Sequence, residues 1–155
     1  MSDDVERIHD LMLRYAELFD GGDLEGFAEL FVRGSLTFKG IDPPCIGSEG
    51  VLDFIDRRVI MHRGKPRTNH VMSNIIVRVG EDRTTATARS HVTVFQATPD
   101  LPLQVIVTGQ YNDVFARDES GWYFVERTAG GGGLTGNLTQ HLRLEANPTR
   151  ETANV

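Results

Sequence analysis

The second half of the chain repeats one pattern: long runs in which apolar and polar residues alternate, separated by short turns. Four such runs cover residues 68–79, 84–97, 103–116 and 122–129. The segments between them are rich in Gly, Asp, Pro and Ser. Alternation places successive side chains on opposite faces of a strand, and turns this short connect neighbouring antiparallel strands. The sequence therefore predicts an antiparallel meander of four long strands.

The first half has the spacing of helices. Apolar residues within 5–19 recur every three or four positions and form one stripe, which predicts an amphipathic helix. Gly21-Gly22 ends this helix, and Asp23 has the chemistry of an N-cap for a short second helix. Ser48 is placed to cap a third helix that extends to about Met61.

The other segments complete an α+β chain. Residues 35–39 predict a short strand, and residues 40–44 predict a loop. Helices that precede a run of strands favour packing on one face of a curved sheet. We expect one folded domain over residues 1–130, followed by a Gly-rich and polar tail over residues 131–155. Three apolar residues are available to anchor that tail as a short helix or strand: Leu138, Leu142 and Leu144.

Composition excludes several classes of function. The 155 residues suit one domain with a substantial core. The net charge of −6 argues against a nucleic-acid partner, because such proteins usually present a basic face. No apolar run approaches the roughly 20 residues that span a membrane, and the acidic start at Met1–Asp4 is unlike a secretory signal. The single cysteine, Cys45, forms no internal disulfide, so we expect a cytoplasmic protein.

Two residues, Asp20 and His70, carry most of the functional signal. Asp20 falls at the predicted end of the first helix, where the helix dipole disfavours a carboxylate unless a proton-donating group compensates. An imidazole is such a group, and a carboxylate that orients a histidine is a common way to make a general base near neutral pH. The alternative is a strand histidine that hydrogen-bonds a helix end for structure alone.

Short motifs follow one another along the chain in a defined order. They are Tyr15-(x4)-Asp20-x-x-Asp23, Leu30-Phe31, Gly47-x-Glu49-Gly50, Asn69-His70-(x3)-Asn74, Ala86-x-Ala88-x-Ser90, Gly109-x-Tyr111 and Gly121-Trp122-x-Phe124. No single motif is specific. Their order over about residues 5–130 resembles the SnoaL-like group of the nuclear-transport-factor-2-like superfamily.

The resemblance implies a cone-shaped barrel, in which a strongly curved antiparallel sheet and three N-terminal helices enclose an apolar cavity. Scytalone dehydratase, hexachlorocyclohexane dehydrochlorinase and bile-acid 7α-dehydratase belong to this superfamily. They use an Asp at the end of the first helix and a His on the strand after the third helix. Asp20 and His70 fall at those two places, and Tyr15 matches a tyrosine of the bile-acid enzyme. The resemblance therefore implies Asp20, His70 and Tyr15 as catalytic residues.

Two candidates for substrate binding, Asn74 and His91, lie on the predicted strands. Asn74 follows His70 on the same strand and carries a hydrogen-bonding amide. Strict alternation places His91 on one face of the strand 84–97, and a β-bulge would turn it to the other. The remaining histidines stand in no motif, and we expect them on the surface: His9, His62 and His141.

Tyr111 and Arg127 are the other two candidates for substrate binding. Tyr111 resembles Tyr15, whose hydroxyl either donates to a substrate oxygen or belongs to a core aromatic residue that finds another partner. An arginine near the cavity mouth can hold a carboxylate or phenolate. Alternatively, Arg127 pairs with Glu126 or Asp113 on the outer face of the sheet.

Three functions remain open. The first is a cofactor-independent, dehydratase-like lyase or isomerase, in which His70 takes a proton from a small apolar cyclic substrate and Asp20 supports it. The second is an aldol cyclase of the polyketide type, which uses the same carboxylate and cavity. The third is a non-catalytic module that binds a small molecule, like the small subunits of ring-hydroxylating dioxygenases.

The expected partners follow from the same patterns. We expect a small-molecule substrate and neither nucleic acid nor membrane. The sequence contains no dinucleotide or phosphate-loop fingerprint, and its histidines lack the close spacing of a metal site, so we expect no cofactor and no metal. An apolar sheet face that the helices leave uncovered predicts a homodimer or homotrimer.

Overall fold

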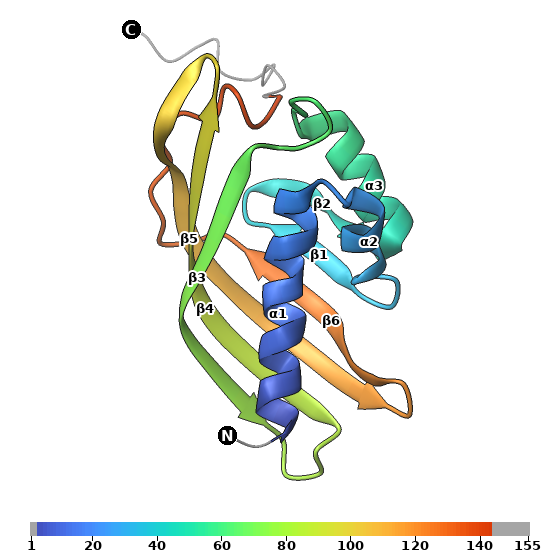
Figure 1. The fold of residues 1–155 in the computed structure, drawn as a ribbon. Helices are drawn as coiled ribbons and strands as arrows, with labels where there is room; N and C mark the ends of the chain where they lie inside the picture. Colours follow the sequence, from blue (N-terminus) through green and yellow to red (C-terminus); the bar gives the residue numbers. More distant parts are fainter. Residues whose placement is uncertain (1–2, 144–155) are drawn as a thin grey trace, which may run out of the picture.

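The computed structural model describes residues 3–143, and it places the helices before the long strands, as the sequence predicts (Figure 1). The elements are α1 (Asp3–Gly21), α2 (Leu24–Glu29), β1 (Ser35–Phe38), β2 (Ile41–Ile46), α3 (Gly47–Arg58), β3 (Thr68–Val79), β4 (Thr85–Thr98), β5 (Leu101–Asp118) and β6 (Gly121–Ala129). Figure 1 shows α1 packed across the curved sheet, with α2 and α3 grouped toward one end.

The six strands form one curved sheet in the order β2-β1-β6-β5-β4-β3. The predicted antiparallel meander is confirmed for β3 to β6. One pair differs, because β1 runs parallel to β6, with Ser35 opposite Glu126. The sheet is therefore mixed, and it remains open between β2 and β3. This is the cone fold expected from the resemblance, with an open sheet.

Two local predictions were wrong. Residues 41–46 form strand β2 where the sequence predicted a loop over 40–44. Pro43 and Pro44 suggested the loop, but β2 lies at the edge of the sheet, where a residue without an N–H is tolerated. Helix α3 is capped by Ile46 without a side-chain hydrogen bond, so Ser48 is not its N-cap. This helix ends at Arg58, three residues before the predicted end.

The predicted turn between α1 and α2 is confirmed. Gly22 adopts a φ of 85°, and a Cβ atom at this position would lie 2.3 Å from the carbonyl oxygen of Gly64. Only glycine fits both conditions. Asp23 then caps α2, since its carboxylate accepts a hydrogen bond from the backbone N–H of Gly26 at 2.9 Å.

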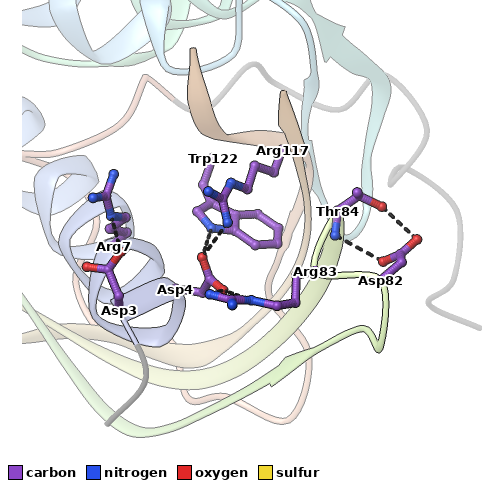
Figure 2. A network of polar contacts seen from close by, with 8 residues as sticks. All are labelled: Asp3, Asp4, Arg7, Asp82, Arg83, Thr84, Arg117 and Trp122. Carbon is purple, nitrogen blue, oxygen red and sulfur yellow. Dashed lines mark hydrogen bonds and ion pairs between the residues drawn. The ribbon is translucent and has the colours of Figure 1, made fainter. Parts of the chain in front are cut away.

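The first turn of α1 is fixed to the sheet through Asp4, whose side chain is buried (Figure 2). Its carboxylate accepts hydrogen bonds from Arg83 Nε at 2.6 Å, Arg117 Nη1 at 2.7 Å and Trp122 Nε1 at 3.1 Å. The hydrogen bonds from Trp122 and Arg83, together with the charges of Arg83 and Arg117, lower the pKa of Asp4 below its ordinary value. A carboxylate also suits the positive end of the helix dipole. These contacts hold α1 against the end of the sheet farthest from Asp20.

The chain after β6 returns along β5 toward the end of α3 (Figure 1). The backbone N–H groups of Thr108 and Gly136 bond the carbonyls of Leu134 and Ile106, both at 2.8 Å. Farther on, Leu142 pairs with Val59 in an isolated β-bridge. Two of the predicted anchors, Leu138 and Leu142, pack against the core, and Leu144 lies outside the described residues. Among residues 3–143, no helix is both long enough and apolar enough to cross a membrane.

Candidate active site

A cavity of about 300 Å³ lies between α1, the end of α3, strands β4 and β5, and the chain after β6. This volume is at the lower end of the range for small-molecule sites. Most of its wall is aromatic or aliphatic. The polar side chains in the wall come from Tyr15, Lys39, His70, Thr108, Tyr111, Thr135 and His141.

Asp20 and His70 are in direct contact at the end of α1. Asp20 Oδ1 lies 2.6 Å from His70 Nδ1. Asp20 Oδ2 accepts a hydrogen bond from the backbone N–H of His70 at 2.7 Å. Thr68 Oγ1 donates a third hydrogen bond at 2.7 Å. The imidazole is 8% exposed and the carboxylate 18%. Thr68 and His70 face inward together because they are two residues apart on β3.

This geometry decides which ring nitrogen of His70 carries the proton. An ionised carboxylate can only accept hydrogen bonds, so Nδ1 donates to Asp20 and Nε2 keeps its lone pair. Within residues 3–143, no group hydrogen-bonds Nε2, and the ring lines the cavity. The arrangement thus presents an unprotonated ring nitrogen at the cavity wall, with a carboxylate behind it that can stabilise an imidazolium.

Tyr15 and Tyr111 form the part of the cavity wall beside His70. Their ring centroids are 5.5 Å apart, and the Tyr15 ring is 6.4 Å from the His70 ring at a nearly perpendicular angle of 83°. Burial raises the pKa of Tyr15, although the Arg127 charge and a hydrogen bond from Tyr111 act against this shift. Burial also raises the pKa of Tyr111, and the neighbouring Tyr15 adds to the effect. Both phenols therefore stay protonated and can donate hydrogen bonds at neutral pH.

Arg127 lies behind the tyrosines and does not reach the cavity wall. Its side chain is fully buried and pairs with Asp113 through two hydrogen bonds, Nε to Oδ1 at 2.7 Å and Nη2 to Oδ2 at 2.8 Å. The guanidinium carbon lies 4.2 Å from the ring centroids of both Tyr15 and Tyr111. Arg127 therefore does not line this cavity, and its role in substrate binding stays a prediction. The alternative partner Asp113 is found, on the inner face of the sheet instead of the outer one.

Asn74 and His91 also lie outside the cavity. Along β4, even-numbered residues from Ala86 to Gln96 are buried, so His91 faces outward. Asn74 sits in the irregular pairing between Ser73 and Ile76, where its φ is 52°. Its amide lies 3.4 Å from His91 Nδ1 on the exposed face. Neither residue therefore lines this cavity.

His141 is the site residue that the sequence analysis missed. We expected it on the surface, but only 7% of it is exposed, and it lines the cavity. A signal was present in its spacing from two leucines, because Leu138, His141 and Leu142 are three and four positions apart, as on one face of a helical turn. The backbone N–H groups of His141 and Leu142 both bond the Leu138 carbonyl at 2.9 Å.

Among residues 3–143, no three His, Cys, Asp or Glu side chains gather in a way that could hold a metal ion. His70 and Asp20 meet, but His91 lies on the outward face of β4.

Comparison with known proteins establishes the family. Residues 1–128 match the SnoaL-like domain, and the chain belongs to this family. No curated protein sequence matches the chain significantly.

Solved structures share the fold. An NTF2-like protein with a cystatin-like fold from Novosphingobium aromaticivorans is 26% identical, with a TM-score of 0.68 over 82% of this chain and 80% of that one. A proposed aromatic ring hydroxylase from the same organism is 24% identical, with a TM-score of 0.69 over 89% of this chain and 96% of that one. ActVI-ORFA from Streptomyces coelicolor is 16% identical, with a TM-score of 0.66 over 81% of this chain and 94% of that one. The last two show the fold alone.

Proposed function

We propose that this protein is a cofactor-independent lyase of the dehydratase type, which acts on a small, mostly apolar cyclic ketone bearing a β-hydroxyl group. The observation that carries the proposal is the Asp20–His70 contact of 2.6 Å at the wall of a cavity of about 300 Å³. A base that is held by a carboxylate and faces an apolar cavity suits the removal of a proton from carbon.

The proposed reaction begins when His70 Nε2 takes a proton from the carbon next to the substrate carbonyl. The C–H bonding electrons move toward the carbonyl and give an enolate, while the imidazolium is stabilised by Asp20. When the enolate collapses, a carbon–carbon double bond forms and the C–O bond to the β-hydroxyl breaks. The leaving oxygen takes the proton back from the imidazolium. Substrate therefore becomes an unsaturated ketone and water, and the protein returns to its starting state.

The tyrosine pair supplies hydrogen bonds for this reaction. Because burial raises the pKa of both phenols, each remains a donor and neither competes with His70 as a base. A hydrogen bond from Tyr15 to the departing oxygen stabilises the charge that grows as the C–O bond breaks. The Tyr111 ring packs against the Tyr15 ring, with 5.5 Å between centroids, and limits the movement of the Tyr15 side chain.

The test uses 3-hydroxy-1-tetralone, whose dehydration yields fluorescent 1-naphthol. We expect the wild-type protein to accelerate naphthol formation over buffer, and His70→Ala to reduce the rate by about 10²-fold or more. His91→Phe removes a histidine that lies outside the cavity and serves as the matched control, with a rate equal to that of the wild type. A wild-type rate no greater than that of His70→Ala would contradict the proposal.

A further inference from the structure

A second histidine, His141, faces the cavity that contains His70. It belongs to the chain after β6, beyond residues 1–128 that match the family. The Phe19 ring lies against both imidazoles, 5.3 Å from His70 and 6.1 Å from His141 between ring centroids. The two histidines therefore occupy the same end of a small cavity, within reach of one bound molecule.

The backbone around His141 is held by contacts with three parts of the fold. The His141 carbonyl accepts the N–H of Ile60 at 2.9 Å. The carbonyl of the preceding residue, Gln140, accepts Gln96 Nε2 at 3.0 Å and His62 Nε2 at 2.7 Å. On the other side, the Arg143 N–H bonds the Arg58 carbonyl at 2.7 Å. The backbone that carries the imidazole is thus fixed by hydrogen bonds on both sides of His141.

The His141 side chain makes no hydrogen bond within residues 3–143, and because its Nδ1 atom is covered by protein atoms, Nε2 is the ring nitrogen that a molecule in the cavity can reach. An unpaired polar group in such a place costs free energy. Burial is the largest cause that lowers the pKa of His141 to about 4; the charges of His70 and His62 act in the same direction, and Asp20 opposes them. The neutral ring has one N–H donor and one acceptor nitrogen available.

We propose that His141 is the group that binds the substrate's carbonyl oxygen, by donating a ring N–H to it while the adjacent carbon faces His70. This inference rests on the proposed function, and it names the residue that holds the carbonyl oxygen of the ketone. Small ketones can accept this hydrogen bond, whereas hydrocarbons of the same shape leave the imidazole unpaired.

The chemistry gives this hydrogen bond a further role. When His70 takes the proton from carbon, negative charge develops on the carbonyl oxygen, and a fixed donor at that oxygen binds the enolate more strongly than the ketone. A neutral imidazole serves as such a donor without giving up its proton. His141 therefore binds and orients the substrate, and no proton is transferred to or from it.

The test compares binding of 1-tetralone with binding of tetralin, which has the same rings but no carbonyl. In His141→Phe, we expect the Kd of 1-tetralone to rise about tenfold while the Kd of tetralin stays the same or falls. His91→Phe is the matched control and should change neither constant. The proposal is overturned if both Kd values change by the same factor, or if the wild type does not bind 1-tetralone.

A second measurement needs no cavity variant. In wild-type protein labelled with ¹⁵N at histidine, 1-tetralone should shift the ring nitrogen resonances of His141, and tetralin should leave them nearly unchanged. Equal shifts with both compounds would overturn the proposal even if His141→Phe fails to fold. Both experiments report binding. A protein that binds 1-tetralone through His141 but never forms 1-naphthol therefore contradicts the proposed reaction while supporting this inference.

Discussion

The buried pair of Arg127 and Asp113 offers a prediction whose size follows from the structure. Both side chains are 0% exposed and share two hydrogen bonds, of 2.7 and 2.8 Å. The guanidinium also stacks on Tyr15, Tyr111 and Phe124, at 4.2, 4.2 and 4.9 Å. Burial acts to lower the pKa of Arg127, but the charge and hydrogen bonds of Asp113 outweigh it and raise the pKa. Removing Asp113 therefore leaves the Arg127 charge without a carboxylate partner among residues 3–143.

The expected cost of breaking the pair is large. Truncating one partner of a buried ion pair typically destabilises a protein by about 3–5 kcal/mol, out of a total of about 5–15 kcal/mol for a domain. With a urea m-value of about 2 kcal/mol/M, Asp113→Val or Arg127→Met should each lower the unfolding midpoint by about 2 M. The measurement is equilibrium unfolding in urea, followed by circular dichroism.

The double variant shows how much of the stability loss in the single variants comes from a buried charge that has no partner. In Asp113→Val/Arg127→Met, no charge remains buried, so the loss should be far smaller than the sum of the two single losses. This result would mean that the pair is costly to break and contributes little net stability. The reasoning is refuted if each single variant costs less than about 1 kcal/mol, or if the two losses simply add.

Three further predictions concern the dyad, His141 and the anchor of α1. Asp20→Asn should slow dehydration of 3-hydroxy-1-tetralone by about 10²- to 10⁴-fold, because the imidazolium loses its carboxylate and the tautomer is no longer fixed. Wild-type stability should fall as pH drops from 6.5 to about 4, because His141 protonates in the unfolded chain first; a pKa lowered from 6.5 to about 4 corresponds to about 3 kcal/mol. Asp4→Asn should lower the urea midpoint at pH 7. The difference from the wild type should begin to shrink below pH 3.8, where Asp4 protonates in the unfolded chain, and should be lost once pH falls through the lower pKa of Asp4 in the native state.

Each of these predictions has its own control. Circular dichroism must show that Asp20→Asn keeps the native fold, and a rate equal to the wild type would contradict the role of the dyad. In His141→Phe, the loss of stability between pH 6.5 and 4 should be reduced; an unchanged pH profile would mean that His141 does not titrate as described. Asp3→Asn, which alters an exposed neighbour of Asp4, should leave the midpoint nearly unchanged.

Strand positions were predictable where alternation was regular. β3 has the predicted bounds, 68–79, and β4 and β6 agree to within a residue. The Asp20–His70 contact was also within reach of sequence reasoning, because a carboxylate at a helix C-terminus needs a donor.

It was harder to predict which face of the sheet each side chain points to, because a bulge adds one residue to a strand and reverses the alternation of its side chains. On β3 the side chains of Thr68 and His70 face inward, but the irregular pairing after Ser73 leaves Asn74 exposed. A similar shift between β5 and β6 brings both Phe124 and Arg127 to the buried face, although they are an odd number of residues apart. A single extra residue in one strand is enough to reverse such an assignment.

The missed residue, His141, shows a second reason why part of the site could not be predicted from the sequence. Its burial depends on the chain after β6 returning to the end of α3, where Ile60 bonds its carbonyl. No local pattern near Gly130–Gly133 indicates the direction in which the chain continues. Long-range contacts of this kind decide the cavity wall, and sequence periodicity carries little information about them.

The most direct test of the Asp20–His70 base is proton exchange at carbon. When 1-tetralone is incubated with the wild-type protein in D₂O near neutral pD, His70 should remove the protons next to the carbonyl, and their NMR signal should decay faster than in buffer. His70→Ala should exchange these protons at the buffer rate, and His91→Phe at the wild-type rate. Exchange by His70→Ala as fast as by the wild type would contradict the assignment of His70 as the base.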